Sequence, residues 1–298
     1  MYTRAFFTLI LLFVSATTLA GQTIDEQRPM SGDGRFHLNA ITGDFRLVGS
    51  DDSQLTITGT LGTDVREWII EGDEGNWNVQ LKPLQNSGRT SRRTTSSRLT
   101  ISVPRGAEIN ATTISGNFEV SDFNGRQVSV QTVSGSIRLD DVAPDRLDVQ
   151  TVSGVQHMDA GGHLSTRLRS VSGNIQASNL SGRISVNSVS GTTELTGSQV
   201  EELEIETVSG RVKADMQPDN NARFRIATHS GNIATTLPAD TPLGLRANTF
   251  SGRISSDFGG QVQRGRGPGE RLDHRSGDGS VELEARSFSG NIEIRIHK

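Results

Sequence analysis

The chain has 298 residues and a formal net charge of −4, with 33 glycines, 8 prolines and no cysteine. The negative charge argues against nucleic-acid binding, which favours a strongly basic face, and the lack of cysteine excludes disulfides, thiolate nucleophiles and Cys-ligated zinc. Hydrophobic residues make up 33% and aromatic residues 5%, a balance that indicates a turn-rich β protein with a core rather than a helical bundle or a disordered chain.

Residues 1–20 have the pattern of a cleaved export signal. Arg4 precedes the apolar run Ala5–Val14, and small residues lead to Ala20. This order predicts a signal peptide cut before Gly21. A membrane anchor is the alternative, but ten strongly apolar residues are fewer than the ~20 that span a bilayer. We therefore expect an exported protein of a bacterial periplasm or cell surface, without a transmembrane span after cleavage. An exported chain without disulfides is typical of a bacterial periplasm.

After a short linker at residues 21–30, residues 31–104 are predicted to form an N-terminal capping β region. Short alternating segments such as 42–47, 55–59 and 77–81 indicate strands of irregular spacing. A β-solenoid must cover its open end to avoid edge-to-edge association, and this region is placed to do so.

A cluster of arginines follows these strands, at Arg89, Arg92, Arg93 and Arg98. Guanidinium groups suit phosphates and carboxylates, so the cluster is a candidate contact for an anionic ligand such as a charged glycan. A solvated polar loop is the plain alternative. No aromatic residues that could stack on bases are interleaved with these arginines, which argues against nucleic acid here.

Residues 105–298 are dominated by a repeat. A Ser-Gly pair recurs at steps of 18 to 21 residues and a last step of 38. The residue two before the serine is always Ser or Thr, the one before it is mostly apolar, and the residues six before and three after are mostly aliphatic. The nine serines are Ser115, Ser134, Ser153, Ser172, Ser190, Ser209, Ser230, Ser251 and Ser289.

Each unit is interpreted as two short strands that meet at the Ser-Gly pair. A unit of about 19 residues cannot bury its own apolar face, so the units must stack. We predict a parallel β-solenoid of roughly ten coils at about 4.8 Å spacing, with the aliphatic columns as its core and a ladder of Thr and Ser hydroxyls. The competing topology is an antiparallel meander or sandwich. In it, the two strands on either side of each Ser-Gly corner form a hairpin. The constancy of single columns favours the solenoid.

Charged residues at equivalent positions support stacking. Asp148 with Arg167 and Glu204 with Arg225 are expected to pair across neighbouring coils, as are Glu119 with Arg138 and Glu194 with Lys213. Residues 258–280, rich in Gly and Arg, take the place of a missing corner and are predicted to be a loop insertion.

Catalytic motifs are scarce. The best constellation is Asp140 and Asp159, six residues after their serines in adjacent units, with His157 nearby. Two stacked carboxylates would suit a glycosidase, whereas the plain interpretation is that both residues end strands at a polar corner. His229, in the mostly apolar column, is interpreted as a packed histidine rather than a ligand. The sequence predicts no metal site and no cofactor.

The repeat resembles that of the bacterial putative-adhesin family of unknown function. The likeness rests on residues 99–120, the iterated Thr-Val-Ser-Gly and the opening stretch Gly43–Gly49, and it extends over about residues 31–298. The resemblance implies a β-solenoid-like fold, an envelope location and an adhesive or scaffolding role, and it brings no catalytic residues.

Three functions follow as hypotheses. The first is a non-enzymatic, adhesin-like binding or scaffolding module whose partner is an envelope glycan or another envelope protein. The second is a polysaccharide hydrolase or lyase that uses Asp140, Asp159 and His157. The third is a protein-binding partner in envelope-stress sensing.

Overall fold

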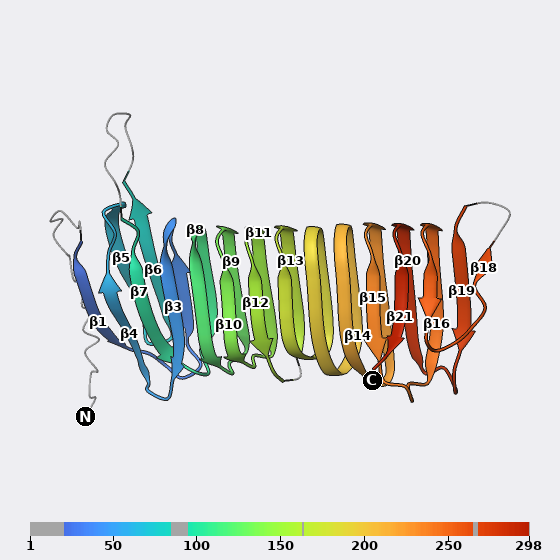
Figure 1. The fold of residues 1–298 in the computed structure, drawn as a ribbon. Helices are drawn as coiled ribbons and strands as arrows, with labels where there is room; N and C mark the ends of the chain where they lie inside the picture. The colour runs from blue at the N-terminus through green and yellow to red at the C-terminus, as the bar shows by residue number, and fades with distance from the viewer. Residues whose placement is uncertain (1–20, 85–94, 163, 265–267, 298) are drawn as a thin grey trace, which may run out of the picture.

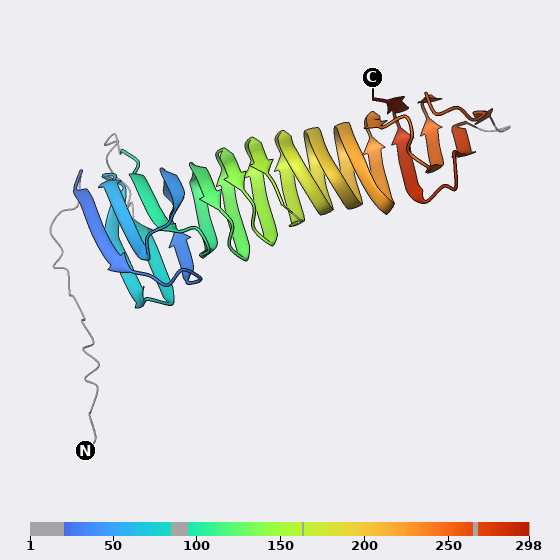
Figure 2. The same cartoon turned by 90° about the horizontal axis from the view of Figure 1, so that it is seen from below.

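The protein is an elongated stack of β-coils (Figures 1 and 2). The computed structural model describes residues 21–84, 95–162, 164–264 and 268–297. Each coil has one strand before its Ser-Gly corner and one after it, and equivalent strands of neighbouring coils pair in parallel and in register. The predicted solenoid is therefore confirmed, and the hairpin alternative is wrong for these coils.

We call the strands before the corner the first sheet and the strands after it the second sheet. In stack order the first sheet contains β5 (Val65–Asp73), β6 (Asn76–Pro83), β2 (Arg35–Asn39), the start of β8 (Glu108–Phe123), β9 (Gln127–Ser134), β11 (Arg146–Ser153), β13 (Leu164–Ser172), three passes of β14 (Ile175–Ser230), β20 (Val281–Ser289), β16 (Leu243–Ser251), β19 (Glu270–Arg275) and β18 (Gln263–Arg264).

The second sheet follows the same stack on the other side of the core. It contains β1 (Thr23–Pro29), β4 (Gln54–Thr60), β7 (Arg98–Pro104), β3 (Thr42–Ser50), the end of β8, β10 (Ile137–Val142), β12 (Gln156–Ala160), three passes of β14, β15 (Ile233–Leu237), β21 (Ile292–Ile296) and β17 (Ile254–Ser256). Since β8 and β14 run through their corners, the two sheets are continuous.

The core lies between the two sheets and consists of stacked columns. The residues six before and three after each corner serine are buried at every coil, as predicted. Gln156 and Thr193 are the polar members of the otherwise apolar column three residues after the serines. Gln156 is fully buried, and its Nε2 donates to the Thr151 hydroxyl (2.9 Å) and to the Arg169 carbonyl (2.6 Å).

The corner glycines stack so tightly that no side chain fits. The first of them is Gly43, whose carbonyl oxygen lies against the glycine of the next coil. From that coil onward, an added Cβ would lie only 1.8–2.1 Å from the carbonyl oxygen of the preceding glycine. In stack order these residues are Gly116, Gly135, Gly154, Gly173, Gly191, Gly210, Gly231, Gly290 and Gly252. The close approach of two backbones, more than a turn conformation, explains the glycine in each repeat.

Polar side chains near the corners bond mainly to the backbone of a neighbouring coil. In the buried Thr and Ser column, Thr132 and Thr249 donate to glycine carbonyls at 3.3 and 3.0 Å, whereas Thr151 donates to the Ser170 hydroxyl at 3.5 Å. Four of the nine hydroxyls in this column donate to backbone carbonyls, whereas those of Ser188, Thr207 and Thr228 have no hydrogen-bond partner among the described residues, so the predicted hydroxyl ladder is not continuous. Two residues after the serine, the side-chain oxygen of Asn232 accepts a hydrogen bond from the N–H of Asn291. The side-chain oxygen of Asn291 in turn accepts one from the N–H of Arg253 in the next coil.

The two ends of the stack have an interleaved order. At the C-terminal end β20 lies between the last pass of β14 and β16, and β21 lies between β15 and β17 (Figure 1). At the N-terminal end β2 lies between β6 and β8, and β3 lies between β7 and β8. In both cases a coil near the chain terminus is covered by strands that lie farther from that terminus in the sequence.

The segment predicted to be a loop insertion, residues 258–280, forms much of the C-terminal cap. Strand β19 pairs antiparallel with β16 and covers the end of the first sheet, and β18 pairs with β19. The expectation of a loop throughout is therefore wrong for β18 and β19. The apolar side chain of Leu272 is fully buried against the last coil, which anchors β19 on the stack.

Candidate functional site

An exposed apolar ridge runs along the outer face of the first sheet, beside the corners. It consists of the residues that directly precede the corner serines, at the last outward-facing position of each strand. In stack order they are Ile114, Val133, Val152, Val171, Val189, Val208, His229, Phe288 and Phe250. Their apolar members are 37–52% exposed, and they account for eight of the eleven large hydrophobic residues exposed in the described part of the chain.

The ridge corrects a prediction from the sequence. This column was expected to join the core with the other aliphatic columns, but strand alternation points it outward because the buried hydroxyl column is its direct neighbour. His229 is likewise exposed, and it stacks on Phe288 with ring centroids 4.9 Å apart, while Phe250 stacks on the other face of Phe288 at 4.8 Å. Single exposed hydrophobic residues are ordinary, whereas a continuous exposed apolar row of this length is uncommon on a soluble monomer.

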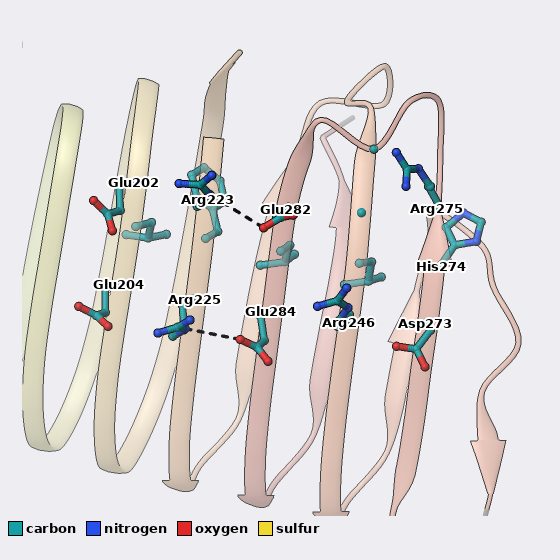
Figure 3. Close-up of a pocket in the computed structure, with 16 residues that line it drawn as sticks. Glu202, Glu204, Arg223, Arg225, Arg246, Asp273, His274, Arg275, Glu282 and Glu284 are labelled. Atoms are coloured by element: carbon teal, nitrogen blue, oxygen red, sulfur yellow. Dashed lines mark ion pairs between the residues drawn. The ribbon is translucent and has the colours of Figure 1, made fainter. Parts of the chain in front are cut away.

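Charged columns lie beside the ridge on the same face, and they line an open hollow of about 540 Å³ near the C-terminal end (Figure 3). Arg223 contacts Glu282 at 4.0 Å, and Arg225 contacts Glu284 at 3.5 Å. Strand register places Arg246 on the other side of Glu284. The glutamates of the interleaved β20 therefore lie between the arginines of β14 on one side and the arginine of β16 on the other.

The four predicted inter-coil ion pairs have mixed outcomes. Arg167 contacts Asp148 at 3.8 Å and Lys213 contacts Glu194 at 2.7 Å, as predicted. Arg225 pairs with Glu284 rather than Glu204, because β20 is its other neighbour. Arg138 is in register with Glu119 but bonds to Asp140 of its own strand at 2.8 Å.

Glu270 connects the C-terminal cap to the last coil. One of its carboxylate oxygens accepts from the N–H of Ile254 at 2.7 Å, the other contacts Arg264 at 2.9 Å, and the side chain is only 9% exposed. The Ile254 N–H, followed by the Arg264 guanidinium, holds the pKa of Glu270 below its usual 4.5, against the effect of burial. The charged carboxylate therefore stabilises the fold.

Replacing Glu270 with glutamine is expected to lower stability by about 1 kcal/mol at pH 7, because a charge-assisted hydrogen bond becomes a neutral one. Since the folded pKa is depressed, the advantage of the wild type is complete above the unfolded pKa near 4.5 and is lost as the pH falls through the folded pKa. Melting temperatures of wild type and Glu270→Gln between pH 3 and pH 7 should converge at the acidic end. A constant difference across this range would contradict the assignment.

The candidate catalytic residues lie on the outer face of the second sheet, on the side opposite the ridge. The carboxylate of Asp140 pairs with Arg138, and that of Asp159 accepts from the Asn179 amide at 2.6 Å. His157 contacts the Gln176 side chain at 3.3 Å and lines a shallow hollow whose lining includes neither aspartate. Asp140 lies in a stretch where the register with β12 shifts. The structure thus gives each carboxylate its own partner rather than a shared site.

The arginine cluster is only partly within the described residues. Arg89, Arg92 and Arg93 lie outside them. Arg98 begins β7 and lies 3.8 Å from Asp44 on the outer face of the second sheet. Within residues 21–84, 95–162, 164–264 and 268–297, no group of three or more His, Asp or Glu side chains is arranged to hold a metal ion.

These features define a class of protein, namely a two-sheeted β-solenoid with capped ends and an exposed apolar ridge. The chain belongs to the Toastrack DUF4097 family, whose model matches residues 35–295. This confirms the family resemblance recognised in the repeat. Among curated proteins none matches the chain.

Several solved structures are similar over most of their length. They include a putative adhesin from Parabacteroides merdae (13% identity, 92% of this chain and 96% of that chain, TM-score 0.41), a lipid binding protein described as putative from Parabacteroides distasonis (11%, 94% and 97%, 0.35) and a similarly described cell adhesion protein from Clostridium sporogenes (11%, 93% and 100%, 0.29). At these values the likenesses carry no argument about function. In the described part of the chain no helix is long and apolar enough to cross a membrane, and the predicted signal peptide lies outside that part.

Proposed function

We propose that the protein is a non-enzymatic binding or scaffolding module of the bacterial cell envelope, with an adhesin-like role. Its binding surface is the outer face of the first sheet. The observation that carries this proposal is the ridge, which presents nine side chains at the strand spacing of about 4.8 Å. A row of equivalent groups suits multivalent contact, in which many weak interactions add along one surface.

The other repeated side chains are less suited to this role. The Thr and Ser column is buried, and the asparagines at the corners use their side-chain oxygens to bond the next coil. The outward-facing rows of the first sheet combine apolar and charged groups over a long surface. We propose an envelope glycan or another envelope protein as the partner and the periplasm or cell surface as the location.

Co-sedimentation of the mature chain with sacculi, lipopolysaccharide or membrane vesicles tests the proposal. We expect saturable pelleting with one fraction that persists at high salt, because apolar contacts are not screened. The double variant Val171→Ser and Val189→Ser should weaken this binding about tenfold, since two half-exposed valines lose their apolar contact area.

The matched control replaces two exposed valines that are not members of the ridge, Val155→Ser and Val262→Ser. It should bind as the wild type does. Salt-sensitive pelleting with every anionic fraction, or equal weakening by both double variants, would contradict the proposed surface. Pelleting with none of the fractions would contradict the proposed envelope-binding function.

A further inference from the structure

The charges beside the ridge are distributed unequally on the two sides of Val189. One coil toward the N-terminus, Arg167 and Arg169 of β13 share a single acidic partner, Asp148, at 3.8 and 3.7 Å. One coil toward the C-terminus, β14 presents glutamates on the same outer face, and in the described residues they have no cationic group within 4.0 Å. We call the first strand the basic strand and the second, with Glu202, Glu204 and Glu206, the acidic strand.

The basic and acidic strands occupy equivalent columns. Arg167 and Glu204 both lie five residues before their corner serines, and Arg169 and Glu206 both lie three residues before theirs. The corresponding ridge residues, Val171 and Val208, are one coil to either side of Val189. A rotation of 180° about the strand direction at Val189 therefore exchanges the basic strand with the acidic strand.

We propose that the ridge binds a second copy of this chain, placed antiparallel along the first with a two-fold axis at Val189. The proposal rests on the first-sheet face being the binding surface proposed above, and it narrows the partner of that surface from an envelope glycan or protein to a second copy of the chain. In this arrangement Arg167 and Arg169 of one copy face Glu204 and Glu206 of the other, and the same contacts occur twice. The strand directions of the two sheets stay aligned, as in the common packing of sheets face to face, and the interface is isologous.

Three observations favour a second copy over a lipid or a glycan as the occupant of the ridge. The ridge has a period of about 4.8 Å, and a second copy has the same period, so side chains can interdigitate along about 40 Å. The chain also carries a net charge of −4, which disfavours an anionic lipid surface, whereas the antiparallel arrangement pairs the excess charges of the basic and acidic strands. The stacked rings at the end of the ridge cover one another's faces, which leaves mainly their edges for contact.

A charge exchange tests this arrangement. In sedimentation velocity at low salt we expect the wild-type mature chain to be dimeric, and both Arg167→Glu with Arg169→Glu and Glu204→Arg with Glu206→Arg to be monomeric. An equimolar mixture of the two double variants should form a heterodimer, because every reversed charge then meets its opposite. The control Arg138→Glu with Arg295→Glu, on the outer face of the second sheet, should remain dimeric. Circular dichroism should show that all variants are folded.

Cysteine mapping tests the orientation, and the absence of native cysteine makes it unambiguous. Under oxidation Val189→Cys should form a disulfide with its own copy, whereas Val133→Cys should do so only when mixed with Phe288→Cys. Self-crosslinking of Val133→Cys at the rate of Val189→Cys would overturn the antiparallel arrangement.

A monomeric wild type at every concentration would overturn the inference. The proposed function fails separately, when the wild type pellets with no envelope fraction or when its pelleting is insensitive to Val171→Ser and Val189→Ser. A monomeric protein whose pelleting depends on these valines would reject the second copy and keep the ridge as a surface for an envelope ligand.

Discussion

Replacing Gly154 with alanine is expected to lower the free energy of unfolding by about 3 kcal/mol or more, the cost of overpacking together with backbone strain. The added Cβ would lie 1.8 Å from the Gly135 carbonyl oxygen, and the residue has a φ of 154°. Since the obstacle is backbone held between two coils, no side-chain rotation relieves it. Urea unfolding followed by circular dichroism measures the loss.

Gly161→Ala is the matched control, because the chemical change is the same and the Cβ position has no atom within 4 Å. It should change stability by less than about 1 kcal/mol. Hydrogen exchange should show the damage of Gly154→Ala first in the adjacent coils, since solenoid coils contact only their neighbours. Equal stability of the two variants would contradict the stacking of glycines as the basis of the repeat.

A chain truncated after Ser280 still contains its last full coil, residues 243–256. This coil is nevertheless expected to lose its ordered structure. The deletion removes β20 and β21, which are the parallel neighbours of β16 and β17. It also removes buried Leu283, Ile292 and Ile294, each worth about 1.5–3 kcal/mol of apolar burial. Hydrogen exchange across residues 243–256 should rise to the rate of an unprotected segment. Protection equal to that of the full chain would show that these residues do not depend on the interleaved coil.

The charges explain why the truncated chain should not close the gap by itself. Docking β16 directly on the last pass of β14 would place Arg246 opposite Arg225, whereas in the full chain Glu284 lies between them. Arg246→Glu in the truncated chain should therefore restore part of the protection. The same substitution in the full chain should weaken it, because the introduced carboxylate would then face Glu284.

The central coils are predictable from the sequence because each is specified by its neighbours. The buried columns, the corners and the parallel pairing all follow from residues that recur at fixed offsets, such as Val128 and Leu147 in the core. The ends are not predictable in this way. Their interleaving depends on the choice of neighbours among similar strands, and the Ser-Gly spacing is the same whether β16 pairs with β14 or with β20.

The candidate surface could have been found in the sequence by a stricter use of strand alternation. The buried hydroxyl of Thr151 and the exposed Val152 are adjacent, so only one of the two columns can face the core, and the apolar one was the natural but wrong choice. Burial of the Thr and Ser column is offset in part because four of its hydroxyls bond to backbone carbonyls of a neighbouring coil. The arginines and glutamates on either side of Val189 can be identified in the sequence. Their two-fold relation becomes apparent only from the stack order.

The interleaved C-terminal coil also affects how the chain reaches its final form. Domains generally fold from the N-terminal part first during synthesis, so residues 243–256 are made before the strands that separate them from the last pass of β14. The final strands must therefore enter between two segments that already exist. Completion of the molecule therefore depends on its last residues, and an incomplete chain presents an open parallel edge that other strands can join. In this way the fold itself distinguishes finished from unfinished copies, and proteases or chaperones that recognise such an edge would remove only the latter.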